Sequence, residues 1–326
     1  MQTLPIHEYF PHASRLIYGC MALGGNWQAD ALSKAHVEEA KQMLDVCLDN
    51  GINMFDHADI YGHGLAEAAF GEALKSQSHL REKIIIQSKC GIRFADGKQQ
   101  AVTRYDFSKE WIIQSVENSL TRLNTDYLDI LFLHRPDPLM QPDEVASAFE
   151  QLKRSGKVRN FAVSNMNAHQ IQLIQSEASV PVIANQIEMS LAQLNWLNEG
   201  ISANQNTMAS VGFNAGTIEH SRLNNIQMQS WGSLAQGLFS GREKLDESNE
   251  RIRQTSALVR SLAADYQTSA EAILLAFLWR HPMKMQTVVG SSNTSRIAAC
   301  SLVEAVSLSA EHWYQLYVSA RGEALP

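Results

Sequence analysis

Residues 33–56 read SKAHVEEAKQMLDVCLDNGINMFD, an amphipathic segment followed at once by a short apolar run. Apolar residues recur through Ser33–Asn50 with the period of a helix. The run Ile52–Asp56 has the length and composition of a buried strand and ends on a carboxylate. A helix that leads directly into a strand is the repeating unit of an α/β fold.

The same alternation recurs along the chain. The expected strands are Leu16–Met21, Ile52–Asp56, Ile84–Lys89, Leu128–His134, Val158–Ser164, Val182–Glu188, Ile226–Trp231 and Thr287–Gly290. The expected helices are Ser33–Asn50, Leu65–Lys75, Ser108–Arg122, Pro142–Ser155, Ala168–Glu177, Ile218–Asn224, Ala270–Arg280 and Ser295–Ala305. Eight strands that alternate with helices favour a closed (β/α)8 TIM barrel, formed as a single domain over residues 1–326. An open Rossmann sheet is disfavoured, because Gly19, Gly24 and Gly25 lack the Gly-x-Gly-x-x-Gly spacing after the first strand.

Composition and charge exclude several classes of protein. Of 326 residues, 45% are hydrophobic and 19% charged, so we expect a packed globular core. The formal net charge of −7 disfavours nucleic-acid binding, which needs a basic surface. No apolar run approaches the ~18 residues of a membrane span, and the first residues do not resemble a signal peptide. Cysteines at positions 20, 47, 90 and 300 lack CxxC spacing, which favours free thiols in a reducing cytoplasm over zinc or disulfides.

Two segments interrupt the alternation. Asn195–Asn214 is rich in Asn, Ser and Ala and is expected to be a long loop after the sixth strand. Leu234–Leu245, which includes Gly237, Gly241 and Arg242, is expected to be a loop after the seventh. Both loops would leave the carboxyl-terminal face of the barrel, where barrel enzymes place their sites.

Polar residues end three neighbouring strands: Asp56, Lys89 and His134. Because side chains alternate along a strand, Lys89 shares its face with Gln87. The carboxyl ends of barrel strands open on one face, so these three side chains should meet there. Tyr61 follows Asp56 by five residues and can fold over the same opening from its loop.

This set of side chains suits the reduction of a carbonyl group. A free tyrosine has a pKa near ~10, too high for an efficient acid at neutral pH. A cation beside its hydroxyl lowers that pKa, so Lys89 could activate Tyr61 while Asp56 holds Lys89 in place. His134 could donate a hydrogen bond to the carbonyl oxygen. Singly, each residue has an ordinary structural explanation, such as a buried ion pair, but together they favour a catalytic site.

Several blocks of the sequence resemble the aldo-keto reductase family. They are Gly51–Gly62 (GINMFDHADIYG), Ser88-Lys89, Leu131–Pro136 (LFLHRP), Val163-Ser164-Asn165 and Asn185-Gln186, in the order and spacing of the family. The resemblance runs from about Ser14 to about Cys300 and is greatest to bacterial oxidoreductases with DHADIYG and SKCGI blocks. It implies hydride transfer between NADPH and an aldehyde or ketone, hence a small-molecule carbonyl substrate. It also implies a tetrad of Asp56, Tyr61, Lys89 and His134, with Tyr61 as the general acid.

The resemblance also implies how NADP(H) binds. Ser164, Asn165 and Gln186 match the residues that hydrogen-bond the nicotinamide carboxamide, and Trp231 matches the aromatic on which the ring stacks. The other expected contacts are Gly19, Cys20, Met21, Leu234, Gly237, Gly241, Arg242, Gly290, Ser291, Ser292, Asn293 and Arg296. The small polar residues before Arg296 open a helix, whose N–H groups can bind a phosphate, although an ordinary helix cap would look the same. Arg296 itself could bind the 2′-phosphate.

Two positions depart from the family pattern. His57 stands where the family usually has Thr, and alternation turns it to the face opposite Asp56, which favours a structural role. Ala299-Cys300 replaces a Glu-Asn pair that lies near the adenine in many relatives, so that contact is in doubt.

Two other functions are compatible with the sequence. A metal-dependent barrel hydrolase could use Asp56, His57, Asp59, His63 and His134, but alternation separates Asp56 from His57, and Lys89 would place a cation beside the metal. We therefore expect no metal site. The other is a barrel that binds the cofactor and serves as a regulatory subunit of a channel, with little turnover. A complete tetrad does not distinguish it from an enzyme.

Overall fold

The computed structural model describes residues 3–25, 27, 31–95, 102–203, 205, 211–241 and 249–326. Eight strands are hydrogen-bonded in the order β1-β10-β9-β8-β7-β6-β3-β2 of a closed barrel. They are β1 (Leu16–Gly19), β2 (Met54–Asp56), β3 (Ile85–Cys90), β6 (Leu128–Leu133), β7 (Val158–Ser164), β8 (Val182–Glu188), β9 (Gln227–Trp231) and β10 (Gln286–Val289). This order confirms the predicted (β/α)8 barrel. Two further strands, β4 (Ile92–Arg93) and β5 (Arg104–Tyr105), form a separate antiparallel ribbon.

Helices follow the barrel strands, as the alternation predicted. The α-helices are α1 (Lys34–Asp49), α2 (Leu65–Ser76), α3 (Lys109–Leu123), α4 (Pro142–Arg154), α5 (Ala168–Gln175), α6 (Asn195–Asn198), α7 (Thr217–Leu223), α8 (Glu250–Asp265), α9 (Ala270–Trp279), α10 (Thr294–Ser301) and α11 (Ala310–Arg321). The 3-10 helices are η1 (Pro5–Glu8), η2 (Cys20–Ala22), η3 (Tyr61–Gly64), η4 (Ser78–Lys83), η5 (Glu199–Ile201), η7 (Ala235–Gly237) and η8 (Leu302–Ala305).

The stretch 33–56 folds as its sequence indicates. Ser33 caps α1 by accepting a hydrogen bond from the His36 backbone N–H, and the Ser33 backbone N–H donates to Nδ1 of the His36 ring. After α1 ends, Gly51 adopts a left-handed φ of 73°, which lets the chain turn into β2. The regular strand begins at Met54, two residues later than expected, because the Asn53 side chain is hydrogen-bonded to Ser14 and His12 at the strand entrance.

Internal contacts divide the chain into two compact units. The second unit comprises residues 6–186 and 290–292, and the first comprises residues 1–5, 187–289 and 293–326. A single domain over residues 1–326 stays a prediction.

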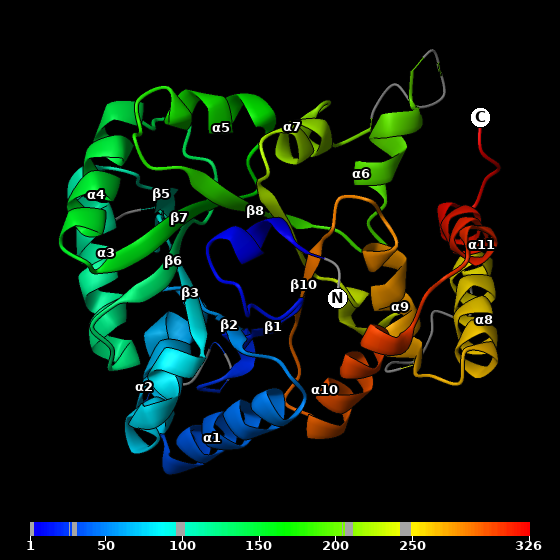
Figure 1. Ribbon diagram of the computed structural model, residues 1–326, viewed down its shortest axis with the longest axis horizontal. Coiled ribbons are helices and arrows are strands. Elements are labelled where there is room, and N and C mark those ends of the chain that lie inside the picture. The colour runs from blue at the N-terminus through cyan, green and yellow to red at the C-terminus, as the bar shows by residue number, and fades with distance from the viewer. Residues whose placement is uncertain are drawn as a thin grey trace. The chain divides into compact units, whose positions relative to one another are not determined.

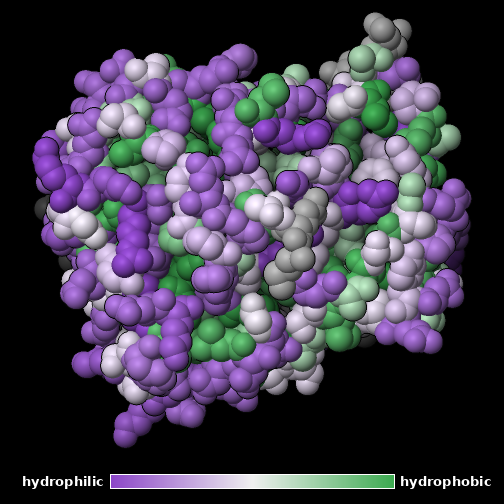
Figure 2. All heavy atoms as spheres, viewed as in Figure 1, coloured by the Kyte–Doolittle hydropathy of each residue, from purple (hydrophilic) through white to green (hydrophobic). Residues whose placement is uncertain are grey.

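The second unit is a layer of parallel strands covered by helices. Residues that alternate outward along the strands pack on the helices: Phe55 lies against Phe70 of α2, and Phe161 stacks on Phe149 of α4. Figure 1 shows α2, α3 and α4 outside β2, β3, β6 and β7. The outer surface of α3 and α4 is largely hydrophilic on the face seen in Figure 2. The inward positions therefore remain for the side chains of the site.

Two long helices of the first unit, α8 and α11, were not predicted from the sequence pattern. They lie side by side (Figure 1). Trp313 of α11 stacks on Phe277 of α9, and its Nε1 donates to the Phe277 carbonyl at 2.9 Å. Both helices pack on other helices, and neither is followed directly by a strand. The alternation of strands and helices therefore could not predict them.

The two expected loops are partly structured. Within 195–214, residues 195–201 form α6 and η5, which corrects the prediction of a loop there. Trp196 is 3% exposed, so an apolar anchor stabilises this short helix despite its polar composition. Ala235–Gly237 forms η7 in the other loop, whereas Arg242 lies outside the described residues.

All four cysteines are free and buried, in agreement with their spacing. No helix in the described ranges is both long and apolar enough to span a bilayer.

Candidate active site

The four predicted catalytic residues come from consecutive strands of the second unit. Asp56 is the last residue of β2, Lys89 is the last but one of β3, and His134 follows β6 directly. Tyr61 opens η3, on the segment that leaves β2. The strand ends thus bring these residues together as the sequence predicted.

Lys89 is the centre of the arrangement. Its Nζ donates to Asp56 Oδ2 at 2.6 Å, to the His57 carbonyl at 2.8 Å and to the Tyr61 hydroxyl at 3.1 Å. The residue is 1% exposed. A buried ammonium has three N–H groups to satisfy, and these three acceptors fix its position beside the Tyr61 oxygen.

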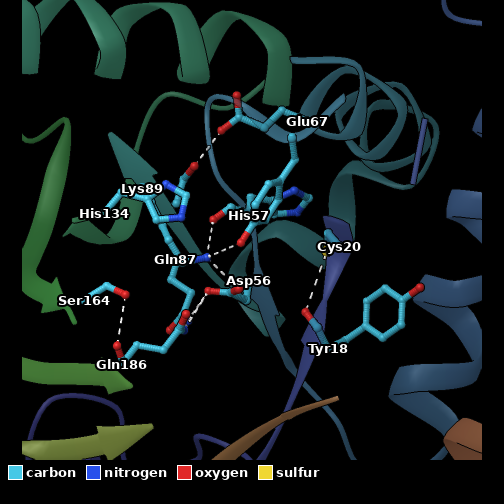
Figure 3. A network of polar contacts seen from close by, with 12 residues as sticks. Tyr18, Cys20, Asp56, His57, Glu67, Gln87, Lys89, His134, Ser164 and Gln186 are labelled. Carbon is cyan, nitrogen blue, oxygen red and sulfur yellow. Dashed lines mark hydrogen bonds and ion pairs between the residues drawn. The ribbon is translucent and has the colours of Figure 1, made fainter. Parts of the chain in front are cut away.

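Asp56 is held from its other side by two amides. Gln87 Nε2 donates to Oδ1 at 2.6 Å, and Gln186 Nε2 donates to the same atom at 3.0 Å. The register places Gln87 opposite Asp56 on the neighbouring strand. Figure 3 shows Gln87, Gln186 and Lys89 converging on the carboxylate. From the sequence, Gln186 was expected to contact the cofactor, and no function was predicted for Gln87.

Burial and charge set the protonation states of Lys89 and Tyr61. Burial alone would lower the pKa of Lys89, but the Asp56 carboxylate and the Tyr61 oxygen raise that pKa above its usual value. The pKa of Tyr61 is also raised, because burial outweighs the lowering effect of Lys89. The lowered pKa of Tyr61 that we predicted from the cation alone is therefore wrong. Tyr61 therefore holds its proton at neutral pH, which is the form that a proton donor needs.

His134 completes the group as a neutral imidazole. Burial, together with Lys89 and Arg135, lowers the pKa of His134 well below its usual value. Its ring centroid lies 6.0 Å from that of Tyr61, with the planes at 82°. A neutral imidazole carries one N–H, which can donate to an oxygen held between the two rings.

A buried ion pair supports the segment that carries Tyr61. Glu67 of α2 accepts from Ser88 Oγ at 2.6 Å and from Arg122 Nε of α3 at 2.7 Å. Gly64 follows Tyr61 with a φ of 92°, and a Cβ there would lie 2.9 Å from the Arg122 side chain. The segment thus packs closely on Arg122. Through this ion pair, Gly64 and Arg122 are connected to Ser88, the neighbour of Lys89.

Two ionisable residues near the tetrad face away from it. The ring of His57 lies 4.6 Å from that of Phe70, on the helix side as alternation predicted, and burial with the Lys89 charge lowers the pKa of His57 to about 3. Burial and the neighbouring Glu67 raise the pKa of Asp59 to about 8, against the opposing effect of Arg122.

The end of β7 presents hydroxyl and amide groups. Ser164 Oγ donates to the Gln186 carbonyl at 2.9 Å, and Asn165 Nδ2 donates to Ser164 Oγ at 2.8 Å. Asn165 adopts a left-handed φ of 59°, which turns the chain out of the strand. Ser164 and Asn165 are thus hydrogen-bonded to each other, and Ser164 is bonded to the backbone of Gln186; their contact with the cofactor stays a prediction.

The end of β1 and residues 290–292 lie together. The Tyr18 hydroxyl donates to the Ser291 carbonyl at 3.1 Å, and a Cβ on Gly290 would lie 3.3 Å from the Gly19 carbonyl. Cys20 is fully buried, whereas Met21 is 53% exposed. Ser292, which is also an expected cofactor contact in this unit, is exposed.

The other expected cofactor contacts belong to the first unit. Trp231 ends β9, and Leu234, Gly237 and Gly241 lie on the segment after it. Asn293 caps α10 by accepting from the Arg296 backbone N–H at 3.3 Å, so the ordinary cap is present. The Arg296 side chain is half-buried in the first turn.

The hydrolase alternative meets a chemical obstacle. The Asp56 carboxylate, its best metal ligand, is occupied by Lys89 and two amides. Within the part of the chain that the structure describes, no three His, Cys, Asp or Glu side chains are grouped as metal ligands would be.

Known proteins resemble this chain along nearly its whole length. A sequence model of the Aldo/keto reductase family matches residues 15–317. Oxidoreductase YdhF of Escherichia coli K12 is 34% identical over 100% of both chains. The 6-dehydroglucose reductase of Agrobacterium fabrum is 35% identical over 95% of this chain and 95% of its own. The crystal structure of an aldo-keto reductase from Klebsiella pneumoniae in complex with NADPH has a TM-score of 0.71 and 23% identity, covering 93% of this chain and 90% of that one.

Proposed function

Because the chain belongs to the aldo/keto reductase family, we propose that it transfers hydride from NADPH to an aldehyde or ketone, with Tyr61 as the proton donor. Membership confirms the resemblance found in the sequence blocks and the oxidoreductase class. The observation that carries the proposal is the Lys89 ammonium, which contacts both the Asp56 carboxylate and the Tyr61 hydroxyl.

Each of the four residues has a separate role in the protonation of the carbonyl oxygen. His134, as a neutral imidazole, donates a hydrogen bond that orients the oxygen. Tyr61 gives up its proton as negative charge develops on that oxygen. The phenolate that remains is stabilised by Lys89 at 3.1 Å. Asp56 keeps the ammonium of Lys89 in place through the 2.6 Å contact.

The residues present fit a nicotinamide cofactor, which when bound supplies the hydride. Ser164, Asn165 and Gln186 offer hydroxyl and amide groups to a carboxamide. Gly290 has no side chain where one would crowd the Gly19 carbonyl. Arg296 near the start of α10 suits the extra phosphate of NADP(H) rather than NAD(H). The Klebsiella relative that was crystallised with NADPH supports the same choice.

A sugar-derived carbonyl compound is the first substrate to test. The relative from Agrobacterium is a 6-dehydroglucose reductase. In this chain the rings of Trp27, His63 and Phe94 contact one another, with centroids 5.3–6.2 Å apart, and His63 is two residues from Tyr61. Aromatic faces of this kind suit the C–H faces of a sugar ring. We place the enzyme in the cytoplasm, a reducing compartment that suits its four free thiols.

The decisive experiment replaces Tyr61 by phenylalanine. Tyr61→Phe should lower kcat by roughly 10²- to 10⁴-fold, because it removes the proton donor, and should leave the Kd for NADPH unchanged. Stopped-flow or steady-state NADPH oxidation measures the first, and quenching of protein fluorescence measures the second. Tyr105→Phe, on the exposed ribbon strand β5, is the matched control and should behave as the unchanged protein.

Two results would contradict the proposal. A Tyr61→Phe enzyme with most of its activity would remove Tyr61 from the reaction. The second result is a wild-type protein that binds NADPH tightly but reduces no aldehyde, ketone or quinone in a broad screen. That result would indicate a regulatory cofactor-binding barrel.

A further inference from the structure

We infer that Gln87 is a positioning residue: its side-chain amide fixes the orientation of the Asp56 carboxylate, and through it the place of Lys89. This inference rests on the proposed reduction, because Lys89 matters only if Tyr61 donates a proton. Gln87 belongs to β3, is fully buried, and has Asp56 as its register partner on β2.

The carboxylate of Asp56 is divided between two kinds of donor. Oδ1 accepts from the amides of Gln87 at 2.6 Å and Gln186 at 3.0 Å, whereas Oδ2 accepts from Lys89 Nζ at 2.6 Å. Rotation about the terminal bond of an aspartate is soft, so one strong contact to Lys89 would leave the carboxylate plane undetermined. A second anchor on Oδ1 removes that freedom and directs Oδ2 at the ammonium.

The two amides are not equivalent. Gln186 lies at the end of β8 among the groups proposed to hold the nicotinamide, and the Ser164 hydroxyl donates to its backbone carbonyl. Gln87 precedes Lys89 by one inward-facing position, and its cross-strand partners are Asp56 and Ile130. The contact through which Gln87 can act on the reaction is its hydrogen bond to Asp56, which makes it a positioning residue rather than a catalytic one.

The burial of the Gln87 amide is explained by its hydrogen bond to Asp56. Burying an amide in an apolar barrel interior is unfavourable unless its hydrogen bonds are made. Here the amide makes a short bond to a charged group, and hydrogen bonds to charged groups are the stronger kind. The register partner of Gln87 on β6 is the apolar Ile130, so an apolar side chain is also compatible with this layer.

The test is a double-mutant cycle between Gln87 and Asp56, made in the full-length protein. Gln87→Met keeps the length of the side chain and removes the donor, and Asp56→Ala removes the acceptor. We expect Gln87→Met to lower kcat by about ten- to a hundredfold, the loss typical of a hydrogen bond to a charged group. The KM for the carbonyl compound and the Kd for NADPH should stay unchanged. In the Asp56→Ala background, Gln87→Met should cause no further loss of kcat.

Gln229→Met is the matched control. Gln229 is a buried glutamine on β9 that donates to Gln286, so its replacement also removes a buried amide bond from the protein. It should lower the thermal midpoint by a similar amount without the loss of kcat. A merely structural role for Gln87 would give both variants the same small change in kcat and would give additive losses in the cycle. Either result overturns the inference.

Unfolding measurements separate this inference from the proposed function. The same cycle is run on the urea midpoint, where a Gln87–Asp56 contact should appear as coupling even in a protein without turnover. If the cycle shows coupling in the urea midpoint but the wild-type protein has no turnover, the proposed reduction is contradicted. The Gln87–Asp56 contact would still be supported by that result. Normal turnover by Gln87→Met would overturn the positioning role alone.

Discussion

Replacing Asp59 by asparagine should remove a pH dependence from the stability of the protein. Asp59 lies two residues before Tyr61, and burial with the neighbouring Glu67 raises its pKa to about 8 from an ordinary value of 3.8. The folded protein therefore keeps a proton at neutral pH that the unfolded chain releases. The stabilisation that comes from the proton on Asp59 is complete below pH 3.8 and is lost as the pH rises through 8. The unfolding free energy therefore falls across this window.

The size of the effect follows from the shift. One pH unit inside the window costs about 1.4 kcal/mol of unfolding free energy per group, and the whole window costs on the order of 6 kcal/mol. His57 acts in the opposite sense, because its pKa falls from 6.5 to about 3 on folding, and its contribution is lost as the pH falls through that range. His57 titrates alike in the variant and in the wild-type protein, so its contribution cancels in the difference between them.

Urea unfolding followed by circular dichroism at pH 6.5, 7.0 and 7.5 gives the required free energies. The difference between Asp59→Asn and the unchanged protein should grow in favour of the variant by about 1.4 kcal/mol per pH unit. Asp49→Asn, at the exposed end of α1, is the control and should give parallel curves. Parallel curves for Asp59→Asn as well would refute the reasoning, because they would mean that Asp59 is ionised in the folded state.

Two further predictions concern the proposed reaction. In Lys89→Met, the loss of activity at high pH should move to higher pH, because Lys89 is the group that lowers the pKa of Tyr61; an unchanged pH–rate profile would exclude that effect. In Arg296→Ala, the preference for NADPH over NADH should shrink by roughly ten- to a hundredfold, the worth of a charge-assisted contact to the 2′-phosphate. Fluorescence titrations with both cofactors measure it, and equal affinities for them in the unchanged protein would contradict the assignment.

The sequence predicted the parts of the fold that depend on local pattern. Asp56 and His134 were placed at strand ends because periodicity and strand length are local properties, and His57 was correctly turned toward the helices by alternation. The extra helices α8 and α11 were missed because they pack against each other outside the strand–helix alternation.

The sequence predicted that Asp56, Tyr61, Lys89 and His134 lie close together, but it did not predict the hydrogen bonds around them. Alternation put Gln87 on the same face as Lys89, but its bond to Asp56 depends on the register between β2 and β3, which periodicity does not specify. The raised pKa of Tyr61 was missed for a related reason. Burial decides it, and burial depends on the whole surrounding structure rather than on the nearest charge.

The proposed proton-transfer residues are unevenly distributed along the chain. Asp56, Tyr61, Lys89 and His134 all lie between residues 56 and 134, whereas the segments after β8 and β9 supply none of them. Substitutions in those later segments therefore leave all four of these side chains in place.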